Sequence, residues 1–575
     1  MPRLVPIVLL SLLSLPVVAP AQSFADFLRQ AFEEHLRDNP EFATGVGRHE
    51  YDDRWTDWSK AGREQRRQHL QQRLEKLAAF PPASLSRQDR LSARLMDYDL
   101  RRRLEAFDLE SELFAVMQQN GLHNAIYSTI DRMPARTVRD YQNLVARLAA
   151  VPGYIDQNLA MLDEAIARGV VQPQIVVDLV SQQLDGQIAQ DANSTRLLAA
   201  FRAFPANFPA AEQARLRAEG VNVYEKQFLP AWRKYREYLK DKYALSVRAT
   251  AGLGSIPNGR EAYAILTRFY TTTNTTPDEI HQLGLSEVER IEGEMQALVR
   301  QAGRSGSISD YEHYLEASPD QHFHSQDEML AYARNVAKIV EPELPNQFRG
   351  IPQLLYGVRA IPAEREAATA TNAQAPSPDY STPGWMNLNT YQPEKQVKYD
   401  KQALVLHEAV PGHIFQLTLA RSLAGLPDFR RFYSNSAYVE GWGLYAESLG
   451  AQLGVYRDPA DHFGQLASER FRAVRLVVDT GLHAMGWTRE QAIDYFKTHA
   501  PSESLAEIDR YIAWPGQALS YKMGQLKIRQ LRTQAIEKLG PRFDIREFHE
   551  VVLRDGVLPL ELLQQQVAEW LRTAQ

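Results

Sequence analysis

Apolar residues recur three and four positions apart along most of the chain, which is the spacing of amphipathic helices. From Phe24 to about Thr250 this pattern is almost continuous, and charged residues cover the opposite faces of segments such as REQRRQHLQQRLEKLAAF and DYQNLVARLAAVPGYIDQNLAMLDEAIARG. Prolines interrupt the pattern near residues 81, 152 and 205–209, and strand signals are few. The first half of the chain is therefore predicted to be helical.

The second half shows the same helical spacing and one candidate strand. Pro277 and the two acidic residues after it are typical of the first turn of a helix. Residues 360–384, rich in Ala, Thr, Ser and Pro, indicate a long loop, and residues 384–391 (GWMNLNTY) are the best strand candidate. Helical patterns resume at Lys401 and continue to the end. We predict a mostly α fold in which a large helical body carries a small β-sheet.

Composition narrows the class of protein. The chain has 575 residues, of which 44% are hydrophobic and 24% charged, and these values exclude a disordered or low-complexity chain. The formal net charge of −6 gives no electrostatic footprint for nucleic acid, so we expect no nucleic-acid partner. The absence of cysteine means that any metal site must use His, Asp and Glu. Residues 22–270 and 271–575 are expected to form two regions of one compact body.

The first 21 residues predict a cleavable export signal. Arg3 precedes an apolar run over residues 4–18, and Ala-Pro-Ala at 19–21 forms a small-residue cleavage pattern. An uncleaved membrane anchor is the alternative, but Pro6 and Pro16 and the shortness of the run disfavour it. A lipid anchor would need a cysteine after the cleavage site. We expect a periplasmic or secreted protein with no membrane span after cleavage.

The segment LVLHEAVPGHIFQ carries the sharpest chemical signal. It contains His407, Glu408 and His413, but its histidines are six apart, not four as in the H-E-x-x-H metalloprotease helix. On an unbroken helix six residues rotate by about 600°, which would point the two rings roughly 120° apart. Pro411 and Gly412 lie between them, and a proline inside a helix breaks it. A break here could bring His413 back toward the same metal ion; the alternative is two unrelated polar histidines.

The segment SAYVEGWGLYAESLG adds carboxylates. Glu440 and Glu447 are seven apart and so lie on one helix face. Two neutral imidazoles and one carboxylate, with a fourth position open, make up a catalytic zinc centre. We therefore expect His407, His413 and Glu440 to bind one Zn²⁺ per chain. Glu447 could orient a histidine ligand from behind, although a solvated helical acid explains it equally well.

A helical stripe follows in RFRAVRLVVDTGLH. Arg472, Arg475, Asp479 and His483 share one face, and the apolar residues between them imply that the helix is buried. An internal ion-pair network is the favoured interpretation, because buried charges need partners. Asp479 and His483 are also candidates to support the metal site.

A last segment, DRYIAWPGQALSYKMGQ, could form a wall of the site. It carries Arg510, Tyr511 and Tyr521, any of which could donate a hydrogen bond to an oxyanion formed at the metal. From spacing alone, either tyrosine could equally belong to the core.

Four segments in this order, HEAVPGHIFQ, YVEGWGLYAE, RLVVDTGLH and RYIAWPGQALSYKMG, resemble the bacterial family catalogued as domain of unknown function 885. The resemblance covers nearly all of the chain after the signal. Members of the family are regarded as gluzincin-like metallopeptidases, distantly similar to thimet oligopeptidase and neurolysin. Those relatives have a mostly helical body around a deep cleft, and they carry the uninterrupted H-E-x-x-H. The resemblance implies three ligands, a base and a tyrosine: His407, His413 and Glu440 for zinc, Glu408 as general base, and Tyr511 or Tyr521 at the transition state.

The sequence thus predicts an exported zinc peptidase that hydrolyses short peptides by metal-activated water. Residues 384–391 are expected to supply an edge strand that pairs with the substrate backbone. The alternatives are a non-catalytic periplasmic binding protein or degenerate peptidase, another metal-dependent amidase, and a non-haem iron oxygenase. The intact Glu408 argues against degeneracy, and the His-Glu pair on a helix favours zinc hydrolysis over iron. The oligomeric state is left open.

Overall fold

The computed structural model describes residues 22–109, 114–366, 369–377 and 382–574. The predicted signal at residues 1–21 lies outside the described residues. Within the described part of the chain, no helix combines the length and apolar character that crossing a membrane requires.

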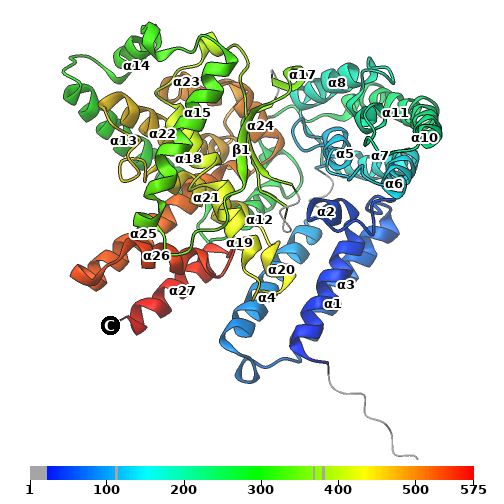
Figure 1. The fold of residues 1–575 in the computed structure, drawn as a ribbon, viewed down its shortest axis with the longest axis horizontal. Coiled ribbons are helices and arrows are strands. Elements are labelled where there is room, and N and C mark those ends of the chain that lie inside the picture. The colour runs from blue at the N-terminus through cyan, green and yellow to red at the C-terminus, as the bar shows by residue number, and fades with distance from the viewer. Residues whose placement is uncertain (1–21, 110–113, 367–368, 378–381, 575) are drawn as a thin grey trace, which may run out of the picture.

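The first half of the chain is helical, as predicted, and forms most of the right side of Figure 1. Its helices are α1 (Phe24–Asp38), α2 (Pro40–Gly45), α3 (Lys60–Leu77), α4 (Arg87–Asp108), α5 (Leu122–Ile130), α6 (Val138–Ala149), α7 (Val151–Arg168), α8 (Gln174–Ile188), α9 (Ala199–Arg202), α10 (Ala210–Val223) and α11 (Leu229–Asp241).

The next segment adds helices that lie mostly in the larger body at the left of Figure 1, and its last helix, α17, lies between the first two strands of the sheet in the chain. These helices are α12 (Gly259–Thr271), α13 (Pro277–Gln301), α14 (Ile308–Ala317), α15 (Gln326–Val340), α16 (Leu344–Gln347) and α17 (Ala363–Glu366). The start of α13 agrees with the prediction, because Thr276 and Glu279 form a reciprocal capping box around Pro277.

A three-stranded sheet lies just before the candidate metal helix. Its strands are β1 (Tyr356–Ala360), β2 (Asn372–Gln374) and β3 (Gly384–Leu388). β3 is central: it pairs in parallel with β1 and antiparallel with β2. The predicted strand is confirmed, but its predicted role as an edge strand is wrong. The continuous loop predicted over 360–384 is also wrong, because α17 and β2 form within it.

The sheet packs against α15, which in turn packs against the helix that follows the sheet. The remaining chain is again helical: α18 (Lys401–Glu408), α19 (His413–Ser422), α20 (Asp428–Arg431), α21 (Ser436–Glu447), α22 (Pro459–His483), α23 (Arg489–His499), α24 (Ala506–Ala513), α25 (Ser520–Leu539), α26 (Ile545–Leu553) and α27 (Leu560–Thr573). The mostly helical class with a small sheet is confirmed.

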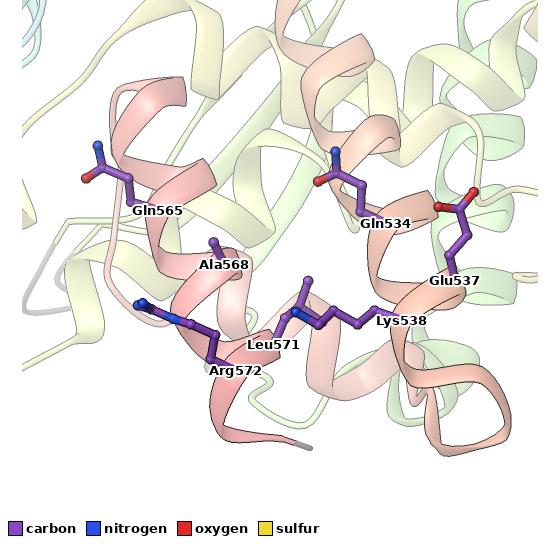
Figure 2. A pocket seen from close by; sticks show the side chains of 7 residues that line it. All are labelled: Gln534, Glu537, Lys538, Gln565, Ala568, Leu571 and Arg572. Atoms are coloured by element: carbon purple, nitrogen blue, oxygen red, sulfur yellow. The ribbon is translucent and has the colours of Figure 1, made fainter.

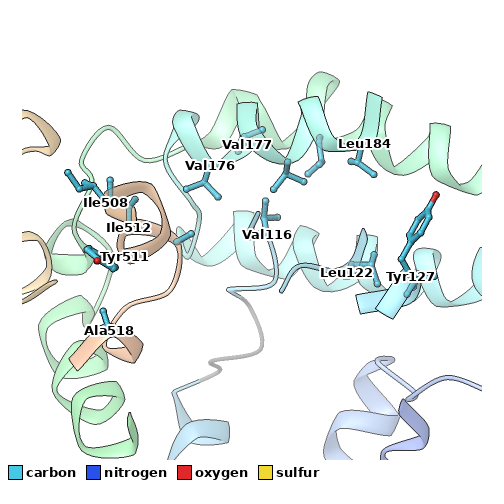
Figure 3. Packing of buried hydrophobic residues seen from close by; sticks show 14 of the residues in the cluster. Val116, Leu122, Tyr127, Val176, Val177, Leu184, Ile508, Tyr511, Ile512 and Ala518 are labelled. Atoms are coloured by element: carbon cyan, nitrogen blue, oxygen red, sulfur yellow. The ribbon is translucent and has the colours of Figure 1, made fainter. Parts of the chain in front are cut away.

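One hydrophobic cluster joins the two halves of the chain. Val176 and Leu184 on α8 belong to the same buried cluster as Ile508 and Ile512 on α24 (Figure 3). In the larger body, α13 packs along α22 and α21 packs along α25. The site helices α18, α21 and α22 are therefore held from several sides, with α22 buried almost throughout.

Candidate metal centre

The helix break predicted between the two histidines is present. α18 ends at Glu408, and α19 begins at His413. The connecting residues fold back on the end of α18 so closely that a Cβ on Gly412 would lie 1.9 Å from the carbonyl oxygen of His407. Trp442 on α21 secures this connection, because its indole nitrogen donates a 2.8 Å hydrogen bond to the carbonyl oxygen of Pro411. The extra two residues are absorbed in the break.

The break brings the three expected metal ligands together. The imidazole centroids of His407 and His413 are 4.7 Å apart, and the rings are nearly perpendicular. Glu440 Oε2 lies 3.5 Å from Nε2 of His407 and 3.3 Å from Nε2 of His413. One ligand atom from each residue lies within 4.8 Å of the others. Their residue types and separations suit a single metal ion.

These separations can be compared with the dimensions of a zinc site. Two ligand atoms at 2.0–2.2 Å from a tetrahedral zinc lie about 3.3 to 3.6 Å from each other. The two contacts of Glu440 Oε2 fall in this range and exceed the 2.7–2.9 Å of an ordinary charge-assisted hydrogen bond. The donor set of two imidazoles and a carboxylate also fits zinc chemistry.

Glu447 lies behind the first histidine, on the same face of α21 as Glu440. Its Oε1 is 2.8 Å from Nδ1 of His407, and the carboxylate is fully buried. Burial alone would lower the pKa of His407, but its contacts with Glu440 and Glu447 raise the pKa to about 10. Because Nδ1–H donates to Glu447, Nε2 is the nitrogen presented toward Glu440 and the candidate metal position.

Two glycines let α21 approach the site elements closely. A Cβ on Gly443 would lie 2.8 Å from Cε1 and 2.9 Å from Nε2 of His407. A Cβ on Gly441 would lie 2.4 Å from Cα of Gly524, so the backbones of α21 and α25 are in direct contact. Both positions need the absence of a side chain for the ligands to stand where they do.

Glu408, the candidate general base, ends α18 directly beside the ligand His407. Its side chain is mostly buried, yet its carboxylate has no hydrogen-bond partner among the described residues. Burial raises its pKa, and the nearby His413 and His407 oppose part of that rise. A carboxylate without a partner, next to two candidate ligands, is available to accept a proton.

The structure separates the two candidate tyrosines. The ring of Tyr521 stacks on His407 with centroids 6.2 Å apart, and its hydroxyl oxygen lies 3.4 Å from a guanidinium nitrogen of Arg510. Tyr511 is fully buried in the cluster of Figure 3, and its hydroxyl accepts from Arg475 and donates to Glu507. Tyr521, with Arg510 beside it, is thus the tyrosine next to the candidate metal ligands.

The expectation that Asp479 and His483 support the metal is not met. Asp479 accepts a 2.5 Å hydrogen bond from the hydroxyl of Tyr263, and burial raises its pKa to about 7. His483 accepts from the backbone N–H of Leu253 at Nδ1 and donates from Nε2 to the carbonyl of Tyr511. The sequence spacing puts both residues on one face of α22, but this helix is buried on nearly every side. Their hydrogen-bond partners therefore come from distant elements that the spacing could not predict.

The other part of the stripe agrees with the ion-pair interpretation. Arg475 pairs with Glu507 on α24 at 2.8 Å. Glu507 and the indole of Trp442 are the functional groups that sequence reasoning missed. A partner for Arg475 was expected, but nothing in the sequence indicated which acidic residue it would be.

A surface hollow between α25 and α27 is unrelated to this centre (Figure 2). It begins at Gln534, about 20 Å along α25 from Tyr521. Its lining is Gln534, Glu537, Lys538, Gln565, Ala568, Leu571 and Arg572. The side chains drawn in Figure 2 offer no group of histidines or acids that could hold a metal.

Comparison with known proteins identifies relatives of the whole chain. The family model described as "Bacterial protein of unknown function (DUF885)" matches residues 40–567. A crystal structure from Colwellia psychrerythraea, provisionally described as a lipoprotein, is 27% identical with a TM-score of 0.90, covering 96% of this chain and 99% of that one. A Shewanella oneidensis protein, provisionally described as a lipoprotein of unknown function, is 19% identical with a TM-score of 0.74, covering 95% and 99%.

Two further comparisons do not extend the list of relatives that share this fold. A Bacillus anthracis protein provisionally described as an oligoendopeptidase F is 13% identical over 88% of this chain and 96% of that one. Its TM-score is 0.28, which is too low to establish a shared fold. No curated protein matches the chain.

Proposed function

This chain belongs to the bacterial protein family of unknown function DUF885, and we propose that it is an exported zinc-dependent peptidase acting on short peptides. The observation that carries the proposal is the arrangement at the helix break, where His407, His413 and Glu440 converge and Glu408 stands beside them without a partner. A structural zinc site would need no such carboxylate.

His407, His413 and Glu440 would hold a zinc ion, which would act as a Lewis acid and would lower the pKa of a water molecule to about 7. Glu408 takes a proton from the attacking water while the water oxygen forms a bond to the peptide carbonyl carbon. The same carboxyl then delivers that proton to the nitrogen as the carbon–nitrogen bond breaks. Glu447 holds the His407 ring in place throughout, and the Tyr521 hydroxyl donates to the oxygen that gains charge.

Export is part of the same proposal. It is supported by the apolar, proline-containing start of the sequence with its small-residue pattern at 19–21. Two structural relatives that match nearly the whole chain are provisionally described as lipoproteins. We infer that this chain is likewise exported.

The test compares wild type with Glu408→Gln and with Glu289→Gln, an exposed helical control. Metal content is measured by mass spectrometry, and hydrolysis of a mixture of short peptides is followed by fragment mass. We expect about one zinc per chain in all three proteins and a loss of roughly 10²- to 10⁴-fold in kcat/KM for Glu408→Gln alone. Zinc binding with no hydrolysis by the wild type would favour a binding protein, and full activity of Glu408→Gln would refute the mechanism.

A further inference from the structure

Three arginines surround the tyrosine beside the metal centre. The guanidinium of Arg475 lies 4.5 Å from the centroid of the Tyr521 ring, and that of Arg472 lies 6.0 Å from it. Arg510 reaches the Tyr521 hydroxyl at 3.4 Å. Their side chains are 5%, 13% and 12% exposed, respectively, so three cations share a small and largely desolvated space.

The carboxylates around them leave Arg472 without a close ion pair. Glu507 is shared, 2.8 Å from Arg475 and 3.2 Å from Arg510. The only carboxylate within ion-pair distance of Arg472 in the described part of the chain is Glu447, at 4.0 Å, and Glu447 is already bonded to His407. The Glu503 carboxyl lies near Arg472 and Arg475, whose charges oppose the rise in its pKa caused by burial, but it makes no hydrogen bond or ion pair with either of them among the described residues. A largely buried guanidinium without a close anion is costly unless an anion joins it.

Arg472 has the donors to take such an anion. Its Nη1 is bonded to the Ser468 hydroxyl at 2.7 Å. Its Nε is buried without a hydrogen-bond partner among the described residues, as is Nη1 of Arg475. The closest carboxylate contact of Arg472 Nη2 is the 4.0 Å approach to Glu447, which is too long for a hydrogen bond.

The cluster stands within a short peptide length of the reacting groups. Contacts of 4.0 Å from Arg472 Nη2 to Glu447 Oε1, and of 2.8 Å from there to His407 Nδ1, place Nη2 within about 7 Å of the His407 ring. Arg472 is also among the charges that oppose the burial-driven rise in the pKa of Glu408. An extended peptide spans about 3.5 Å per residue, so one or two residues bridge the gap.

We propose that Arg472, with Arg475 and Arg510, binds the C-terminal carboxylate of the peptide substrate, so that the protein releases one or two residues from a free C-terminus. The proposal rests on the proposed peptidase function. A carboxylate would give Arg472 the close anion that it lacks, and a guanidinium matches the two carboxylate oxygens with parallel hydrogen bonds. A peptide whose C-terminus is an amide lacks the charge and would bind poorly there.

The first test uses pairs of peptides that differ only in a C-terminal acid or amide. For wild type we expect kcat/KM to be about 10- to 100-fold higher for the acid, as charge-assisted hydrogen bonds of 1.5–3 kcal/mol imply. Arg472→Gln should reduce this ratio to nearly one, mainly through KM, and Arg472→Lys should restore part of it. Arg546→Gln, on a half-exposed side chain of α26, is the matched control and should keep the ratio.

A binding test separates this subsite from catalysis. Affinities of the same peptide pairs are measured by calorimetry on zinc-loaded Glu408→Gln, with and without Arg472→Gln, and on metal-free wild type. A preference for the acid that disappears with Arg472→Gln supports the subsite even if the wild type hydrolyses nothing, in which case only the peptidase proposal fails. Equal binding of acid and amide, or hydrolysis that ignores the C-terminus, overturns the subsite and leaves the peptidase proposal intact.

Discussion

Replacing Gly443 by alanine tests the packing around His407 without removing any proposed ligand. The new methyl group would lie 2.8 Å from Cε1 and 2.9 Å from Nε2 of the imidazole, where carbon atoms normally keep 3.5–4.0 Å apart. The ring must therefore shift by roughly half an ångström or more. Glu447 holds its Nδ1 and Tyr521 stacks on its face, so the shift strains both contacts.

A metal site tolerates far less displacement than this. Ligand distances in protein sites hold to about 0.2 Å, and overpacking of a filled interior costs about 1–3 kcal/mol. If the strain falls on the metal-bound state, the zinc dissociation constant should rise by about 10- to 100-fold, since each factor of ten corresponds to about 1.4 kcal/mol. The affinity is measured by competition with a chromophoric chelator, and thermal unfolding of the metal-free protein is recorded in parallel.

Gly293→Ala provides the control. Gly293 lies in the interior of α13, and a Cβ there meets nothing within 4 Å. Both substitutions gain about 1 kcal/mol of helix propensity, so a difference between them reports the contact with His407. Gly293→Ala should bind zinc like wild type and unfold at a slightly higher temperature. Wild-type zinc affinity in Gly443→Ala would refute the geometry assigned to this helix crossing.

Two further predictions concern a carboxylate and a histidine. Glu447→Gln keeps a possible hydrogen bond to His407 but removes the charge, so the same competition assay should show zinc affinity lower by about 10- to 100-fold; an unchanged affinity would contradict its role. His549 accepts from the Tyr445 hydroxyl and donates to the carbonyl of Gln347, and burial lowers its pKa to about 3. Because its unfolded pKa is near 6.5, the unfolded chain binds the extra proton, and stability is lost as the pH falls from 6.5 toward 3. Urea unfolding at pH 7 and pH 5 should show wild type losing about 2 kcal/mol more than His549→Gln, and equal losses would count against a neutral buried imidazole.

The sequence predicted the candidate site correctly where helix geometry between neighbouring residues allowed only one arrangement. Pro411 and Gly412 between the two histidines required a break in the helix, and the break is present. The seven-residue spacing of Glu440 and Glu447 required a shared helix face, and both contact His407. These inferences concern neighbours along one helix or across one turn, where backbone geometry leaves little freedom.

The errors arose where several partners were possible at long range. Asp479 and His483 have residue types that suit a metal site. In the structure, however, Asp479 is hydrogen-bonded to Tyr263 and His483 to the backbone of Leu253. The order of strands within the sheet was equally hidden, because the three residues of β2 are too short to show an alternating pattern. Choosing between Tyr511 and Tyr521 depended on how α24 and α25 pack, which no spacing rule encodes.

The contact between Gly441 and Gly524 couples two halves of the site mechanically. With no side chains between their backbones, α21 and α25 cannot slide or roll past each other without a steric clash. Glu440 on α21 and Tyr521 on α25 are therefore expected to move together as one rigid unit. If the proposed peptidase opens to admit a peptide, that motion has to occur in other elements, so the spacing between Glu440 and Tyr521 is expected to stay constant.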